Sequence, residues 1–324
     1  MTAPPALRQV ISRDGPDRPT AGGPGRPGRL RAAGVPYVLV LPAVAVLAVV
    51  LGYPLVRLVV MSLQEYGLRQ QFGAPAGFVG LANYRRIATD PQFWAVLVRT
   101  VVFCGVTVAL TMTVGMLVAL LMNVLGRAMR TAVGLSLLLA WALPPLSSTI
   151  VWQWMFDTQY GLVNWLLTRV GAGDFRGHSW LSEPLSFFSV AAAVVVWMGV
   201  PFVALTLYAG LTQVPAEVLE AAELDGAGSR QRFRHVTLAY LRPVVLILVA
   251  LSVLWNFRVF TQIYVLQRAG GVNRDTNVLG VYAYRISIGE NRFDVGSAVA
   301  VVMVGLTLLL TAVYLRQMMR QEEL

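Results

Sequence analysis

The chain has 324 residues, of which 56% are hydrophobic and 13% are charged, and its mean hydropathy is +0.64. A soluble domain carries about a quarter charged residues, so this composition excludes an ordinary soluble protein. The net charge is +10, and all 26 basic residues are arginine. The arginines are scattered over short segments and do not form one stripe with interleaved aromatic residues, which argues against nucleic-acid binding.

Residues 1–34 are rich in proline, glycine and arginine and contain few large apolar residues. Such a segment cannot bury enough apolar surface to fold alone, so we predict a disordered tail over residues 1–34. No short apolar core with a small-residue cleavage site precedes the first long apolar stretch, so we do not expect a cleaved signal peptide.

Six apolar stretches follow, each long enough to cross a bilayer as a helix. They are Val35–Val60, Trp94–Val124, Thr131–Phe156, Leu185–Leu211, Val244–Leu266 and Val295–Leu315. The sequence therefore predicts an all-α integral membrane protein with about six transmembrane helices. Arginines are more numerous on the N-terminal side of these spans than on the other side. The positive-inside rule then places both termini, and with them the tail, in the cytoplasm.

Prolines fall within two of the predicted spans, at Pro144, Pro145 and Pro201. Proline removes a backbone hydrogen bond and clashes with the preceding turn, so we expect each site to interrupt its helix. Broken spans are tolerated where they line protein or water, which suits a gate.

The segment between spans four and five is polar and contains a predicted short helix. Pro215 suits the first turn of a helix, and Gly226 can adopt the left-handed turn that ends one. These two residues predict a helix from about Pro215 to Asp225. Its narrow apolar face would be formed by Val218, Leu219 and Ala222.

Two acidic residues, Glu223 and Asp225, lie at the end of this helix where the helix dipole disfavours them. They therefore require a basic partner. The chain itself could supply it from Arg230, Arg232 or Arg234, or a separate protein could do so. A solvated loop is the alternative interpretation of the charge pattern alone.

The same segment reads EAAELDGAGSRQRFRHVTLAYLRP over Glu220–Pro243. It resembles the EAA loop of permease subunits of bacterial ATP-driven importers, with the matching residues Glu220, Ala221, Ala222, Asp225, Gly226, Ala227, Phe233, Val236, Leu238 and Pro243. Ala239 stands where that family usually has proline. Further matching pieces are Tyr53–Pro54, Phe78–Tyr84, Pro144–Pro145, Gly210–Pro215 and Gly296–Ala298. The likeness is strongest to the maltose-type first permease of carbohydrate importers.

This resemblance implies a type I ABC importer permease fold, with a transmembrane permease domain over residues 35–320 and a cytoplasmic coupling loop over residues 213–243. The coupling residues would be Glu220, Ala221, Ala222, Asp225, Gly226 and Ala227. The implied partners are a second permease in a heterodimer, two ATPase subunits, an extracytoplasmic solute-binding protein and a sugar substrate. The implied location is the bacterial inner membrane.

Catalytic and metal-binding patterns are missing from the sequence. His178 and His235 fall on opposite sides of the membrane in the predicted topology, so they cannot form a metal pair. A phosphate-binding loop of the Walker type needs a lysine, and the chain has none. We therefore expect no enzyme activity, metal or cofactor in this chain, with ATP and magnesium held by the partner ATPase.

Polar residues in the fifth span are candidates for a substrate path, because such residues usually face a bundle interior or a cavity. A continuous helix would place Trp255, Arg258, Thr261 and Gln262 on one face, with Asn256 beside them. Sugar recognition uses an aromatic ring against the C–H face and polar groups against the hydroxyls. A polar seam that holds this span to a neighbouring helix is the alternative, and the resemblance favours the substrate cavity.

Other residues of the spans have two interpretations each. Trp197, Pro201 and Tyr208 of span four fall at i, i+4 and i+11, so they face either the same cavity or a buried packing stripe. Arg57 and Arg99 lie near the outer ends of spans one and two, where arginine can extend to the headgroups and anchor the protein.

The sequence is compatible with two other functions. The same fold could import glycerol-phosphate or another small polar solute, with Arg258 as an anion contact. An ion-coupled secondary transporter is a different class, but the spans hold no acidic residue for a proton relay and show no inverted repeat. A membrane-embedded enzyme is disfavoured, because no catalytic cluster is present.

Overall fold

The computed structural model describes residues 40–322, so the predicted tail over residues 1–34 lies outside the described residues. The chain divides into two compact units, Met1–Pro54 and Leu55–Leu324. In the first unit, the described residues include the π-helix η1 (Ala48–Gly52), and α2 (Tyr53–Ser62) begins at the boundary. The second unit contains the other elements.

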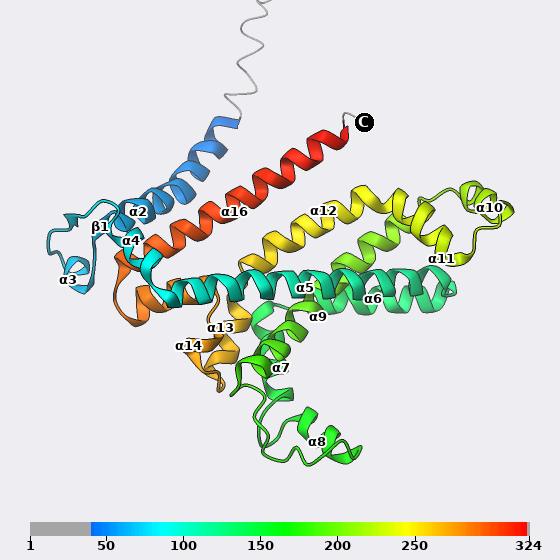
Figure 1. The fold of residues 1–324 in the computed structure, drawn as a ribbon, viewed down its shortest axis with the longest axis horizontal. Helices are drawn as coiled ribbons and strands as arrows, with labels where there is room; N and C mark the ends of the chain where they lie inside the picture. The colour runs from blue at the N-terminus through cyan, green and yellow to red at the C-terminus, as the bar shows by residue number, and fades with distance from the viewer. Residues whose placement is uncertain (1–39, 323–324) are drawn as a thin grey trace, which may run out of the picture. The chain divides into compact units, whose positions relative to one another are not determined.

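The second unit is almost entirely helical (Figure 1). In chain order, its elements after α2 are β1 (Gln64–Glu65), α3 (Leu68–Gln71), β2 (Gly77–Phe78), α4 (Ala82–Thr89), α5 (Pro91–Val124), α6 (Arg127–Ala142), α7 (Pro145–Met155), α8 (Leu162–Arg169), α9 (Pro184–Leu211), α10 (Ala216–Leu224), α11 (Ser229–Arg232), the π-helix η2 (Phe233–Thr237), α12 (Leu238–Phe257), α13 (Thr261–Arg268), α14 (Asn273–Thr276), α15 (Leu279–Tyr284), the π-helix η3 (Arg285–Gly289) and α16 (Phe293–Glu322). The strands β1 and β2 form one short antiparallel pair.

The described residues contain five helices that are long and apolar enough to cross a membrane. They are Val40–Ser62, Pro91–Val124, Pro184–Leu211, Ser229–Arg268 and Phe293–Arg316. A sixth span is formed if the bent pair α6 and α7 counts as one. The all-α, six-span prediction is confirmed. The helical run that contains the predicted span Val244–Leu266 begins earlier, at Ser229, and takes in the second half of the predicted coupling loop.

The prolines of spans three and four have different effects. At Pro144 and Pro145 the helix breaks, and α6 and α7 meet at a bend of 100°, as predicted. At Pro201 the prediction of an interruption is wrong, because α9 runs through it without a break. Pro201 is buried between the buried residues Val200 and Val203. Packing around the proline therefore holds the helix despite the lost hydrogen bond.

The core of the second unit is built on α5 and α9, which share the most extensive helix–helix contact in the described part of the chain. Small residues let them approach closely. A Cβ atom added at Gly115 would lie 2.5 Å from a Val203 methyl, and one at Gly199 would lie 2.9 Å from the Thr111 methyl. Helices in membranes associate through such small residues because lipid supplies no hydrophobic drive between them. α12 packs beside this pair (Figure 1).

We expect Gly115→Ala to destabilise the protein, because its new methyl group overlaps Val203 at the α5–α9 contact. Overpacking of this kind costs about 1–3 kcal/mol of unfolding free energy. Thermal unfolding of the detergent-solubilised protein measures the effect. The matched control is Gly105→Ala on the same helix, where an added Cβ atom meets nothing within 4 Å.

Removing the overlap should restore stability, so Gly115→Ala combined with Val203→Ala should unfold later than Gly115→Ala alone. Equal stability of the Gly115→Ala and Gly105→Ala proteins would contradict the close contact.

Candidate functional site

The helix α10 forms where the sequence predicts it, between the capping residues Pro215 and Asp225. Its end is closed by two backbone hydrogen bonds. The Gly226 N–H donates to the Glu223 carbonyl at 3.0 Å, and the Ala227 N–H donates to the Ala222 carbonyl at 2.9 Å. This is the Schellman pattern, which needs a left-handed residue after the helix. Gly226 supplies it with a φ of +83°, so the predicted turn is confirmed.

The exposed side of α10 carries acidic residues and one large apolar residue. Glu220, Ala221, Asp225 and Gly226 are exposed, while Ala222 and Ala227 are half-buried. The predicted apolar face is also half-buried at each of its three positions, Val218, Leu219 and Ala222. Leu224 is 89% exposed, and the sequence reasoning missed it. Leu224 lies between two acidic residues in the sequence, and this polar setting could have indicated its exposure.

One of the three candidate arginines reaches this helix. Arg232 of α11 forms an ion pair with Glu223. Glu220 and Asp225 have no ion-pair partner among residues 40–322. Figure 1 shows α10 and α11 together beyond the ends of α9 and α12. The structure therefore leaves two carboxylates and Leu224 available on an exposed helix to a partner of complementary charge and shape.

The run from α11 through η2 to α12 connects this helix to the membrane span. The π-helix η2 adds one residue to a turn between α11 and α12, a deviation that is frequent at functional sites. α12 continues through Pro243. α10 is therefore followed by a helical run that begins with α11 and continues to Phe257.

An aromatic cluster lies on three different helices within the spans. The rings of Trp141 on α6 and Phe202 on α9 are stacked with centroids 6.3 Å apart. Phe202 meets Trp255 of α12 edge-on at 5.2 Å. Trp141 is 54% exposed and Trp255 46% exposed, so this chain does not cover the cluster. Trp255 is one of the candidates predicted from the sequence, whereas Trp141 and Phe202 are not. Both lie near a proline within a span, and this position could have marked them as candidates.

The structure does not bring the span-four candidates Trp197 and Tyr208 to this cluster. Trp197 packs against Trp152 of α7 with ring centroids 6.1 Å apart. Tyr208 lies under the guanidinium of Arg130, 5.5 Å from its ring centroid. Both side chains thus pack against other helices of the same chain, which agrees with the alternative interpretation of a packing stripe.

The predicted single helical face around Arg258 is wrong, because α12 ends at Phe257 and α13 begins only at Thr261. Phe257 and Val259, on either side of Arg258, are buried in two separate hydrophobic clusters. This packing outweighs the helical hydrogen bonds lost at the break.

Around the break, the polar candidates take different partners. The exposed Arg258 donates from Nε to the Leu254 carbonyl at 3.2 Å. Gln262 donates to the Met198 sulfur of α9 at 3.5 Å. Asn256 and Thr261 are half-buried. These residues remain candidates, arranged along a broken helix and not on one continuous face.

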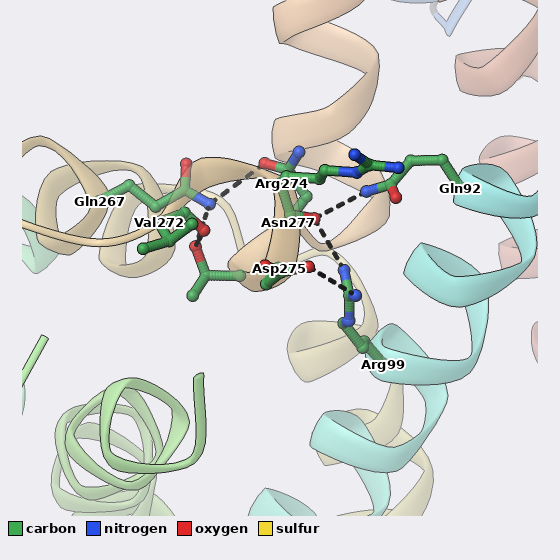
Figure 2. A network of polar contacts seen from close by, with 8 residues as sticks. Gln92, Arg99, Gln267, Val272, Arg274, Asp275 and Asn277 are labelled. Atoms are coloured by element: carbon green, nitrogen blue, oxygen red, sulfur yellow. Dashed lines mark hydrogen bonds and ion pairs between the residues drawn. The ribbon is translucent and has the colours of Figure 1, made fainter. Parts of the chain in front are cut away.

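Arg99 of α5 is engaged by the segment that precedes α15 (Figure 2). Its guanidinium donates to the Arg274 carbonyl at 3.0 Å and forms an ion pair with Asp275 at 3.5 Å. Gln92 donates to the same carbonyl at 2.7 Å. Arg99 therefore has protein partners in addition to its predicted contact with the headgroups, and α14 is tied to α5.

The other side of α14 is tied to α13 by a buried amide. Gln267 donates from Nε2 to the Thr276 hydroxyl at 3.0 Å and to the Asn277 side-chain oxygen at 3.1 Å. Thr276 in turn donates to the Val272 carbonyl at 2.8 Å (Figure 2). These bonds fix the loop over residues 268–277 between α5 and α13.

Five apolar spans, or six with the bent pair α6 and α7, and an exposed capped helix between two of them define a multi-span membrane protein. The chain belongs to the family described as "Binding-protein-dependent transport system inner membrane component", whose model matches residues 88–321.

Among its relatives, the diacetylchitobiose uptake system permease protein DasB of Streptomyces coelicolor is 42% identical over 288 residues, which cover 89% of this chain and 88% of that protein. The trehalose/maltose transport system permease protein MalF of Thermococcus litoralis is 33% identical over 291 residues, covering 89% and 95%. A crystal structure of a bacterial ABC transporter involved in alginate import contains a chain of the same fold. Its TM-score is 0.75 at 18% identity, covering 90% of this chain and 97% of that chain.

We expect Gly226→Pro to loosen α10, because proline fixes φ near −65° and lacks the N–H that donates to Glu223. Amide hydrogen exchange over residues 216–227 should become faster, while exchange in α9 stays unchanged. The matched control is Gly228→Ala, since Gly228 has a φ of −67° and open space around its Cβ position. Unchanged protection of α10 in Gly226→Pro would contradict the capping role.

Proposed function

We propose that this chain is the permease subunit of an ATP-driven importer and forms, with a second permease, the membrane path for a sugar or oligosaccharide. An external solute-binding protein delivers the sugar, and two ATPase subunits bind at the cytoplasmic side. The sequence has no lysine for a Walker-type phosphate-binding loop, so ATP hydrolysis with its magnesium ion is assigned in this proposal to the partner ATPase. The names of the relatives, which are permeases of diacetylchitobiose and trehalose/maltose systems, support the substrate class.

The observation that carries the sugar assignment is the aromatic cluster of Trp141, Phe202 and Trp255. Aromatic rings cover the apolar C–H faces of a pyranose, and their partial exposure at the span surface leaves them accessible. The half-buried amide of Asn256, next to Trp255, is a donor and acceptor for hydroxyl groups.

In the mechanism, α10 is the coupling helix. Closure of the ATPases on ATP moves α10, whose acids and Leu224 hold the partner. The ion pair of Glu223 with Arg232 passes this movement to α11, and the helical run Ser229–Arg268 carries it to Trp255. The path then opens alternately to the two sides of the membrane. The cytoplasmic position of α10 and of both termini agrees with the arginine distribution.

Trp255→Ala should reduce sugar uptake, because it removes one of the two exposed rings of the cluster. Loss of one aromatic contact of about 0.5–1.5 kcal/mol corresponds to roughly two- to tenfold weaker binding. Uptake of radiolabelled diacetylchitobiose, maltose and trehalose into proteoliposomes with the complete importer is the measurement. Trp165→Ala is the control, because Trp165 on α8 is also an exposed tryptophan, at 57% against 46% for Trp255. Equal uptake by both variants would remove Trp255 from the path.

Leu224→Ser should weaken binding of the ATPase without affecting folding, because the Leu224 side chain makes little contact within the chain. Co-purification of the ATPase from membranes in mild detergent measures the effect, and Glu220→Arg should act in the same direction. Leu185→Ser is the matched control, since Leu185 is 82% exposed at the opposite end of α9. Full ATPase recovery with Leu224→Ser would exclude this face as the docking surface.

A further inference from the structure

A small pocket lies between α13 and the segment formed by α15 and η3, separate from the aromatic cluster of Trp141, Phe202 and Trp255. Its volume is about 320 Å³. It is lined by Tyr264, Gln267, Arg268, Tyr284, Arg285, Ile288 and Gly289. This volume is at the lower end of the range for small-molecule sites, which suits one sugar ring.

One wall of the pocket is a ladder of side chains spaced by four residues at the start and along one face of α13. Phe260 stacks on Tyr264 with ring centroids 5.3 Å apart and an interplanar angle of 14°. The Arg268 guanidinium lies 5.9 Å from the centroid of the same Tyr264 ring. Tyr264 is therefore held in place before any ligand binds, and Arg268 is oriented by it.

The wall continues at Tyr284, at the end of α15, which is in ring contact with the ladder. Its ring stands nearly perpendicular to Phe260 at 5.5 Å and to Tyr264 at 5.3 Å. Tyr284 is 38% exposed, so part of its ring remains open to a ligand. It directly precedes η3. An added Cβ atom at Gly296 would collide with Ser287, so α16 packs closely against η3 behind this wall.

The pocket continues the exposed side of the broken fifth span. Trp255, Arg258 and Arg268 are exposed, and Thr261 and Tyr264 between them are half-buried, at spacings of three or four residues. None of Trp141, Phe202 and Trp255 lines the pocket, which lies beyond the break in the span. A ligand that contacts both Trp255 and the pocket must therefore be longer than one sugar ring.

We propose that this pocket is a second sugar-binding subsite, which holds an outer ring of an oligosaccharide while Trp141, Phe202 and Trp255 hold another. The inference rests on the proposed function. Tyr284 supplies the ring that stacks on the C–H face, and the Arg268 guanidinium and the tyrosine hydroxyls supply donors to the sugar oxygens. The exposed Arg268 lines the pocket and no carboxylate does, so acceptor-rich substituents fit best.

The test is the dependence of binding on sugar chain length. The assembled importer in nanodiscs, without its binding protein, is titrated by equilibrium dialysis with radiolabelled disaccharides, trisaccharides and tetrasaccharides of N-acetylglucosamine and of maltose type. Tyr284→Leu should weaken tetrasaccharide binding about two- to tenfold and leave disaccharide binding unchanged. Tyr284→Phe keeps the ring and should retain most of the preference for the longer sugar.

Tyr240→Leu is the matched control, because Tyr240 is an exposed tyrosine of α12 outside the pocket. If Tyr284→Leu prevents assembly, Arg268→Gln gives the same test with an exposed side chain. The subsite proposal alone is overturned if Tyr284→Leu, Arg268→Gln and Tyr240→Leu all show the same preference for longer sugars. It is also overturned if the unaltered importer shows no such preference. An unaltered importer that neither binds nor transports any saccharide removes the proposed function, and the subsite with it.

Discussion

The close approach of α5 and α9 is the contact on which the rest of the second unit depends. Gly115 lies against Val203 and Gly199 against Thr111, so the two backbones are nearer than larger side chains would allow. In a membrane, such packing is a main source of association between helices. α9 continues through Pro201 without a break beside this contact, which places Phe202 in the aromatic cluster and leads the chain on toward α10.

The coupling helix and the spans are linked by local features that each have a simple cause. The left-handed Gly226 ends α10 with two satisfied carbonyls, and the Arg232–Glu223 ion pair ties α10 to α11. An exposed ion pair contributes little stability, about 0–1 kcal/mol, so its value lies in orientation. Beyond η2, the helix continues into the membrane, where movement of α10 in the proposed mechanism reaches Trp255.

The break at Arg258 divides the fifth span into two parts with different neighbours. Before the break in the chain, Trp255 contacts Phe202 of α9. After the break, the ladder of Phe260, Tyr264 and Arg268 contacts Tyr284. The buried Gln267 and the paired Arg99 hold the following loop between α13 and α5. Polar groups that would be costly in lipid are thereby satisfied within the protein.

The sequence by itself determined the helical class, the six spans, the capped helix before Gly226 and the family. These follow from apolar length, from the conformational freedom of one glycine and from a motif of adjacent residues, all of which are local properties. Only the tertiary structure decided that α9 continues through Pro201, that span five breaks at Arg258, and that Trp141 and Phe202 join Trp255 while Trp197 does not. Each of these outcomes depends on packing between helices far apart in the chain, which outweighs local propensity and which periodicity within one helix cannot report.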